Sequence, residues 1–197
     1  LQKAGYQLNV PDGIDSQCCG MPFQSKGQFA AAEAKQRELE QWLLKVTNNG
    51  AIAVFSDTSP CSLTLRGKLD PRLTIYDSVD FLHDKVLPKL KITPLSEPVA
   101  LHITCSASQL GQADKLKRLL AACSDNVVIP QGISCCGFAG DKGFALPELN
   151  ASALSGLQQQ VSACSQGVST SRTCEIGLSQ HSGIEYQHLV YLLDRCS

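Results

Sequence analysis

Cysteine is the residue type with which this sequence could do chemistry. The 197-residue chain contains ten cysteines, at positions 18, 19, 61, 105, 123, 135, 136, 164, 174 and 196. Four of them form the adjacent pairs Cys18-Cys19 and Cys135-Cys136, and a glycine follows each pair. No Cys-x-x-Cys occurs in the chain, which argues against a thioredoxin motif, a zinc ribbon and a clustered ferredoxin run.

Four interpretations of these cysteines stay open. An even number is typical of a disulfide framework, but such frameworks belong mainly to short secreted chains without a core, and 43% of this chain is apolar. A dispersed zinc site is a second interpretation, and cysteines that only fill the core are a third. We favour the fourth, a cysteine cluster that holds several metal ions. Two consecutive side chains generally diverge, so they can ligate different irons of one cluster.

The charge balance excludes some classes of partner. Lys and Arg number 17 against 18 for Asp and Glu, which gives a net charge of −1. This balance offers no electrostatic reason to expect nucleic acid or an anionic membrane as partner. No apolar run approaches the roughly 18 residues that a bilayer-spanning helix requires.

The chain contains an internal repeat in which three blocks recur in the same order. The matched blocks are 1–22 with 120–139, 55–61 with 168–174, and 75–79 with 185–189. The second copy also has the run Val99–Cys105, which ends in a cysteine 25 residues before Pro130. The same offset before Pro11 falls outside the chain. We therefore expect a fragment whose first copy lacks its opening strand, its opening cysteine and most of a helix.

Strands and helices that alternate predict an α/β fold with short parallel sheets flanked by helices. We expect two similar halves, residues 1–92 and 96–197, related by a pseudo-twofold axis and joined by the linker 91–98. In the first half we expect a short strand after the first helical turn, a helix over 28–48, a strand over 51–56 and a helix over 78–88. In the second half we expect strands near 98–104, 126–129, 167–170 and 184–186, and helices near 108–123, near 147–164, after position 174 and up to about 195.

Ligands collect at the carboxyl ends of parallel strands. Cys105 ends one expected strand, Cys135 and Cys136 follow a second through a loop, and Cys174 follows a third. We therefore predict that these four sulfurs converge at one sheet edge as metal ligands. The matching positions of the first half are Cys18, Cys19 and Cys61.

We place three further residues beside the bound group: Gly20, Gly137 and Ser171. A tight turn around a bulky cluster accounts for the glycines better than a phosphate loop, because no G-x-G-x-x-G is present. The pairs Thr170-Ser171 and Asp57-Thr58 could hydrogen-bond to sulfur or cap the following helix.

The remaining candidates have structural interpretations. We expect Cys123, Cys164 and Cys196 to be small buried residues. His102 is expected in the core or in support of a ligand. His181 and His188 could donate hydrogen bonds to the cluster sulfurs or serve as caps and surface residues.

The residues carry a resemblance to a known family. Each half resembles the cysteine-rich CCG domain, which has a cysteine, thirty-odd residues, Cys-Cys-Gly, thirty-odd residues and a further cysteine. That domain occurs in the cysteine-rich chain of heterodisulfide reductase and in the iron–sulfur chain of glycolate oxidase. The strings SQCCGMPF, SDTSPC, LHITCS, CCGFAGDKGF and STSRTCEIGLS are similar to the C-terminal part of FAD-linked D-lactate dehydrogenases. Where heterodisulfide reductase has Cys-x-x-Cys, this chain has Thr58-x-x-Cys61 and Ser171-x-x-Cys174, so one ligand per half is missing from the five-cysteine pattern.

This resemblance implies the iron–sulfur electron-transfer region of a flavin-dependent 2-hydroxy-acid dehydrogenase that acts on D-lactate. It implies a 4Fe-4S cluster, which we expect to be largely lost from the isolated fragment, and FAD in an upstream domain. The implied partners are the upstream flavin and ferredoxin-like domains and a respiratory electron acceptor, in the cytoplasm or at the inner membrane surface. Two alternatives stay open: a structural or docking domain without a cluster, and a thiol–disulfide module. The latter is disfavoured because no helix-start cationic setting for a reactive thiolate is visible.

Overall fold

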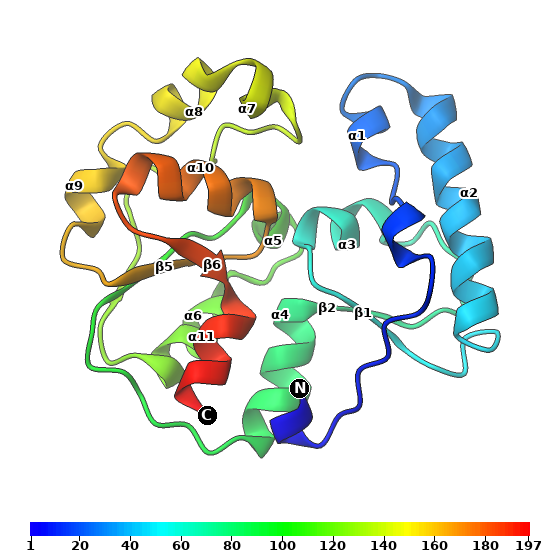
Figure 1. Ribbon diagram of the computed structural model, residues 1–197, viewed down its shortest axis with the longest axis horizontal. Coiled ribbons are helices and arrows are strands. Elements are labelled where there is room, and N and C mark those ends of the chain that lie inside the picture. The colour runs from blue at the N-terminus through cyan, green and yellow to red at the C-terminus, as the bar shows by residue number, and fades with distance from the viewer.

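Two parallel β-sheets form the framework of the chain, in a computed structural model that describes all 197 residues (Figure 1). The larger sheet has the strand order β4-β3-β5-β6, and the smaller one pairs β1 with β2. The strands are β1 (Val54–Ser56), β2 (Ile75–Asp77), β3 (Val99–Leu101), β4 (Val127–Val128), β5 (Gln166–Ser169) and β6 (Tyr186–His188). The predicted α/β class with parallel sheets flanked by helices is confirmed.

Eleven α-helices connect and cover these strands. They are α1 (Met21–Gln24), α2 (Phe29–Val46), α3 (Ser59–Leu65), α4 (Ser78–Phe81), α5 (Cys105–Gln109), α6 (Ala113–Cys123), α7 (Lys142–Ala145), α8 (Pro147–Ala153), α9 (Leu157–Val161), α10 (Arg172–Ser182) and α11 (Leu189–Cys196). A π-helical turn, Leu82–Val86, continues α4, and 3-10 turns cover Gln2–Ala4, Ile14–Ser16 and Leu87–Lys89. None of these helices combines the length and the apolar character that a membrane-spanning helix requires.

The larger sheet is covered on both faces, as the sequence of its strands requires. α8 and α10 lie on one side and α6 and α11 on the other (Figure 1). All three residues of β3 are apolar and fully buried, which is typical of a parallel strand with helices on both faces. Gly167 in β5 makes room for the ring of Tyr186, because a Cβ there would lie 2.4 Å from that ring.

The elements of the two halves follow one another in matching order. β1, α3, β2 and α4 of the first half match β5, α10, β6 and α11 of the second. The starts of α4 and α11 also agree in detail: the side chains of Asp77 and His188 each accept a hydrogen bond from the backbone N–H two residues on. The pseudo-twofold relation of residues 1–92 and 96–197 stays a prediction.

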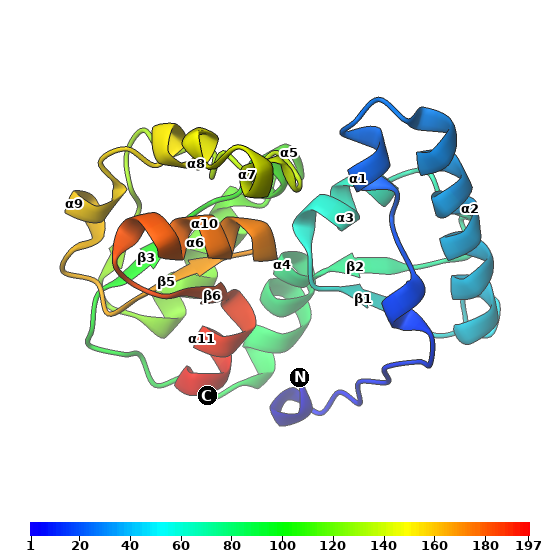
Figure 2. The ribbon, with the colours of Figure 1, turned by 45° about the horizontal axis from the view of Figure 1, so that its top comes forward.

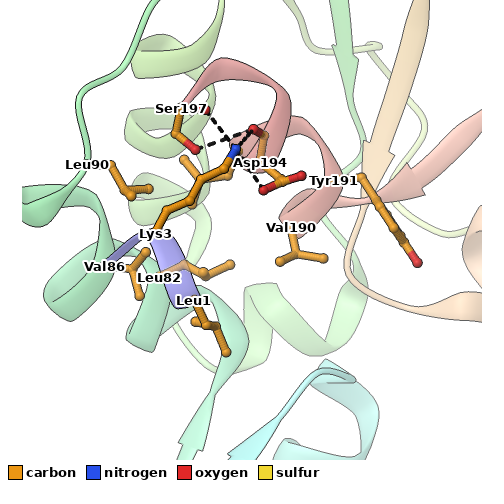
Figure 3. A pocket seen from close by; sticks show the side chains of 10 residues that line it. Leu1, Lys3, Leu82, Val86, Leu90, Val190, Tyr191, Asp194 and Ser197 are labelled. Carbon is orange, nitrogen blue, oxygen red and sulfur yellow. Dashed lines mark hydrogen bonds and ion pairs between the residues drawn. The ribbon is translucent and has the colours of Figure 1, made fainter. Parts of the chain in front are cut away.

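The halves share a core and are therefore packed as one body. The largest apolar cluster contains Val79, Leu82 and Val86 from the first half together with residues of β3, α6 and α11. The 3-10 turn near the N-terminus lies against the C-terminal helix, where Lys3 Nζ donates to the carbonyl oxygens of Asp194 (2.6 Å) and Ser197 (2.7 Å) (Figure 3).

Several predicted boundaries are wrong, mostly at glycines. The helix expected over 108–123 is divided into α5 and α6 at Gly111, and the helix expected over 147–164 into α8 and α9 at Gly156; both glycines have positive φ, at 75° and 79°. The short strand expected after the first helical turn is absent, since residues 7–10 have no strand beside them. β1 and β6 also begin later than expected, at Val54 and Tyr186.

Candidate functional site

Three strands of the larger sheet lead into the cysteines of the second half. Cys105 is the first residue of α5, which follows β3. Cys135 and Cys136 lie in the loop after β4, and Cys174 lies in the first turn of α10 after β5. Because β3, β4 and β5 are parallel, all four cysteines belong to the carboxyl edge of one sheet.

Two of these four thiols are in direct contact. The sulfurs of Cys136 and Cys174 lie 2.8 Å apart, beyond the roughly 2.05 Å of a disulfide bond, and both cysteines are free. Cys105 and Cys135 are exposed on the solvent side of this pair. No three His, Cys, Asp or Glu side chains gather closely enough to hold a single metal ion. The site in this conformation is therefore a buried sulfur pair flanked by two exposed thiols.

The contact between the two buried sulfurs shifts their pKa values in opposite directions. The pKa of Cys136 is lowered to about 7, first by the hydrogen bond that the thiol of Cys174 donates to it, against a smaller opposing effect of burial. The same hydrogen bond and burial raise the pKa of Cys174, whereas a hydrogen bond from Ser171 lowers it. Burial, and then the electrostatic influence of the nearby Cys135 side chain, raise the pKa of Cys105. The pair thus favours one thiolate on Cys136, held by one proton on Cys174.

The glycine after the cysteine pair gives the loop its shape. Gly137 has a φ of 77°, and its N–H donates to the sulfur of Cys135 at 3.3 Å. A Cβ on Gly137 would lie 2.4 Å from the carbonyl oxygen of Leu149 in α8, so the loop approaches that helix more closely than any side chain allows. From the same helix the Nδ2 of buried Asn150 donates to the carbonyl oxygen of Cys136 at 2.7 Å.

The first half repeats this contact pattern. Cys19 Sγ and Cys61 Sγ are 3.1 Å apart, and the hydrogen bond between these two thiols lowers the pKa of Cys19 to about 7. The N–H of Gly20 donates to the sulfur of Cys18 at 3.4 Å, and a Cβ on this glycine would lie 2.6 Å from the carbonyl oxygen of Ala32 in α2.

A side chain of α2 makes the same kind of contact that Asn150 makes in the second half. Gln36 Nε2 donates to the carbonyl oxygen of Cys19 at 3.2 Å. The two sites differ in their cysteine count, because the first half offers Cys18, Cys19 and Cys61 and no fourth thiol.

Two expectations about the surroundings of the cysteines need correction. Thr58 and Ser171 are the N-cap residues of α3 and α10, but neither side chain makes a capping hydrogen bond. The helix expected after Cys174 begins before it, at Arg172, because the cap lies directly after β5. Cys61, Cys105 and Cys174 all lie in the first turn of a helix, but no cationic side chain is hydrogen-bonded to any of them.

The other candidate residues are placed in structural roles. Cys123, Cys164 and Cys196 are buried, as predicted. His102 is also buried, and its Nε2 has no hydrogen-bond partner; burial lowers its pKa to about 4, so the ring is neutral at pH 7. His188 caps α11.

Sequence reasoning missed two groups of polar residues that hold the sites. Gln36 and Asn150 follow the second cysteine of their pairs at different distances, 17 and 14 residues, so the repeat gives no common signal for them. The second group is a buried hydroxyl cluster between the halves. Ser59 Oγ lies within hydrogen-bond distance of the hydroxyls of Ser106 (2.7 Å), Thr104 (3.1 Å) and Thr170 (3.1 Å).

The donor set of the second half fits an iron–sulfur cluster. It consists of four thiols at one sheet edge, and thiolates are the ligands of [2Fe–2S] and [4Fe–4S] clusters. No solved structure matches the chain. A family model described as "CCG: Cysteine-rich domain" matches residues 1–66 and 99–176, which contain both Cys-Cys-Gly sequences. The chain therefore belongs to the CCG cysteine-rich domain family, which is typical of iron–sulfur oxidoreductases.

Proposed function

We propose that this chain is the iron–sulfur electron-transfer region of a flavin-dependent 2-hydroxy-acid dehydrogenase, with D-lactate as substrate. Its partners are the flavin domain of the same enzyme, which carries FAD, the ferredoxin-like domain of that enzyme, and a respiratory acceptor at the inner face of the membrane. The family membership supports the oxidoreductase class, and the strings similar to FAD-linked D-lactate dehydrogenases support the particular enzyme. The observation that carries the proposal is the placement of four cysteines after strands at the carboxyl edge of the larger sheet, with the sulfurs of Cys136 and Cys174 in contact.

In this proposal the second half holds the cluster. Cys105, Cys135, Cys136 and Cys174 are its ligands. When bound, a cluster of this kind accepts and gives up single electrons. The sulfurs of Cys136 and Cys174, which lie 2.8 Å apart, would have to separate for both to ligate a cluster.

The chain's own groups prepare these ligands. The proton that Cys174 holds leaves when both sulfurs bind metal, because a metal ligand must be the thiolate. Gly137 and Gly20 keep the loops in their left-handed turns, and Ser171 supplies a hydrogen bond to sulfur. The apolar cluster around Phe138 and Leu178 keeps water from the inner side of the site.

Anaerobic reconstitution tests the proposal. Purified protein is treated with iron, sulfide and thiol under nitrogen, and iron per chain and visible absorption are measured. We expect bound iron in the wild type and in Cys19→Ser, and loss of most of it in Cys136→Ser. Equal loss in both variants would mean that the first half also binds and that the count of ligands from the repeat is wrong. Absence of iron and colour in the wild type would overturn the proposal.

A second candidate function rests on the sulfur pairs. Cys136 and Cys174, like Cys19 and Cys61, can close a disulfide after a small movement, with release of two electrons and two protons to a dithiol–disulfide partner. Titration with glutathione redox buffer distinguishes the two functions. A thiol–disulfide module exchanges reversibly without iron, whereas the proposed electron carrier needs iron to take up electrons.

A further inference from the structure

The strand β1 has one unpaired edge. On its other edge it pairs with β2, where the N–H of Val54 donates to the carbonyl oxygen of Thr74 at 2.8 Å. Neighbouring residues of a parallel strand direct their N–H and C=O groups to opposite edges, so the backbone groups of Phe55 point away from β2. No other strand lies beside β1 (Figure 2). Unpaired strand groups of this kind are a template for another strand.

An apolar groove lies along this edge. It has a volume of about 550 Å³ and extends between the N-terminal segment 6–14 and β1. Its rim exposes large apolar side chains to solvent, with Leu8 54%, Ile14 49% and Ile52 55% exposed. Exposed apolar side chains that gather in one groove are typical of a binding site for another chain.

The second half shows what occupies the equivalent position there. By the repeat, Phe55 matches Val168 of β5, and the carbonyl oxygen of Val168 accepts a hydrogen bond from the N–H of His102 at 2.9 Å. That N–H belongs to the residue after β3, which lies between β4 and β5. Residues 7–10 correspond to β4 in the same alignment. By this correspondence the groove lies between β1 and residues 7–10. It takes the position in the first half that β3 takes in the second half.

We propose that this groove binds an extended apolar peptide strand, supplied by a polypeptide segment other than residues 1–197, which pairs in parallel with β1. The bound strand requires apolar side chains, because most of the residues that line the groove are apolar, among them Tyr6, Trp42 and Phe81. A helix cannot pair with the backbone groups of Phe55, because its own N–H and C=O groups are bonded within the helix, whereas an extended strand pairs with them at a spacing of about 4.8 Å.

Hydrogen exchange with a peptide probe tests the proposal. The probe is the synthetic peptide PVALHIT, the sequence of residues 98–104, and the readout is the exchange rate of the Phe55 amide in the folded 197-residue protein. We expect the peptide to slow exchange of the Phe55 amide by about tenfold or more and to leave the already paired Val54 amide unchanged. The peptide PVPLHIT, in which proline removes a ladder donor, should have no effect.

Groove variants supply the second arm. Leu8→Glu and Ile52→Glu change exposed side chains of the groove and should weaken peptide binding by about tenfold, a free-energy change of about 1.4 kcal/mol. The matched control is Phe29→Glu, which changes a side chain that is 63% exposed and lies outside the groove, and should bind as the wild type does.

Three results would overturn the proposal. One is an unchanged exchange rate at Phe55 with saturating peptide, and another is an equal effect of PVPLHIT. The third is protection of Phe55 that rises with protein concentration in the absence of peptide, because a second copy of the chain would then be the occupant. None of these measurements uses iron, so their failure leaves the proposed function untouched.

Discussion

The Cys-Cys-Gly sequence gives its two cysteines different surroundings. Cys136 faces inward and contacts Cys174, whereas Cys135 is exposed and accepts a hydrogen bond from the N–H of Gly137. Adjacent side chains that point apart can ligate one bulky group from two directions. This division follows from local backbone geometry, since Gly137 in its left-handed turn brings the loop back against α8.

A glycine substitution tests this geometry. We expect Gly137→Ala to lower the free energy of unfolding by about 3 kcal/mol, through the left-handed backbone and the contact of the new Cβ with Leu149. The matched control is Gly132→Ala, which has nearly the same φ of 76° and open space around it, and should cost only about 1 kcal/mol. Urea denaturation measures both. Equal losses would show that the close approach to α8 contributes nothing.

The shared proton of the buried pair gives a prediction for the metal-free protein. The folded pKa of Cys136, about 7, lies below the usual 9.0, so its thiolate stabilises the fold above pH 9, and this contribution is lost as pH falls through 7. We expect Cys174→Ala to raise the pKa of Cys136, because it removes the hydrogen-bond donor. The ultraviolet absorbance of the thiolate, followed against pH, measures the change. An unchanged titration in Cys174→Ala would contradict the contact.

At the scale of elements, short strands place the cysteines at one edge of the sheet, and a helix follows each of these strands. The connection from β3 to α5 carries both a cysteine and a buried imidazole, His102, within four residues. Thr104 caps α5 by accepting a hydrogen bond from the N–H of Ala107, so the backbone that presents Cys105 is fixed at its base. The base of this connection is therefore buried and hydrogen-bonded, whereas Cys105 is exposed.

His102 makes this connection sensitive to acid. Its pKa is lowered from 6.5 to about 4 by burial, so the unfolded chain takes up a proton between these values and the folded chain does not. Stability is therefore retained above pH 6.5 and decreases towards pH 4, by about 3 kcal/mol in total. We expect His102→Gln to lose this pH dependence between 6.5 and 4 in urea titrations. A slope equal to that of the wild type would assign the acid sensitivity to other groups.

At the scale of the whole molecule, the two halves meet in polar as well as apolar contacts. The hydroxyl of Ser59 in α3 joins hydroxyls at the start of α5 and after β5, so one buried cluster lies between the two cysteine sites. The halves also share an apolar cluster, to which Val79, Leu82 and Val86 of the first half contribute. Together these contacts predict that the halves unfold as one unit.

Trp42, the single tryptophan, lies in the first half and reports its unfolding separately. We expect Ser59→Ala to cost about 2 kcal/mol, because it leaves buried hydroxyls without a partner, and to separate the tryptophan fluorescence transition from the circular dichroism transition. The control is Ser62→Ala, since Ser62 hydrogen-bonds only within the first half, to Ser56 and Thr58. In that variant the two transitions should coincide. Coincident transitions in Ser59→Ala would mean that the apolar core alone couples the halves.

The sequence predicted the class of fold and the edge of the sheet, but not the sulfur contacts. Periodicity and the repeat placed Cys105, Cys135 and Cys174 after three strands, because a parallel strand order needs only local patterns. These sequence patterns could not show which thiols touch, because the contact of Cys136 with Cys174 depends on how α10 packs on the sheet. Asn150 and Gln36 were missed for the same reason, because their partners are backbone carbonyls 14 and 17 residues away.

The close approach of both Cys-Cys-Gly loops to their helices has a consequence at the level of the gene. Every missense change of a glycine codon adds a Cβ, and at Gly20 and Gly137 that carbon meets the carbonyl oxygen of Ala32 or Leu149. These two codons therefore have no mild missense neighbours, whereas an alanine at position 132 would meet no atom within 4 Å and would cost only the left-handed backbone. In a random library sorted for folded protein, we expect amino-acid changes to disappear from both Cys-Cys-Gly codons and to survive at codon 132.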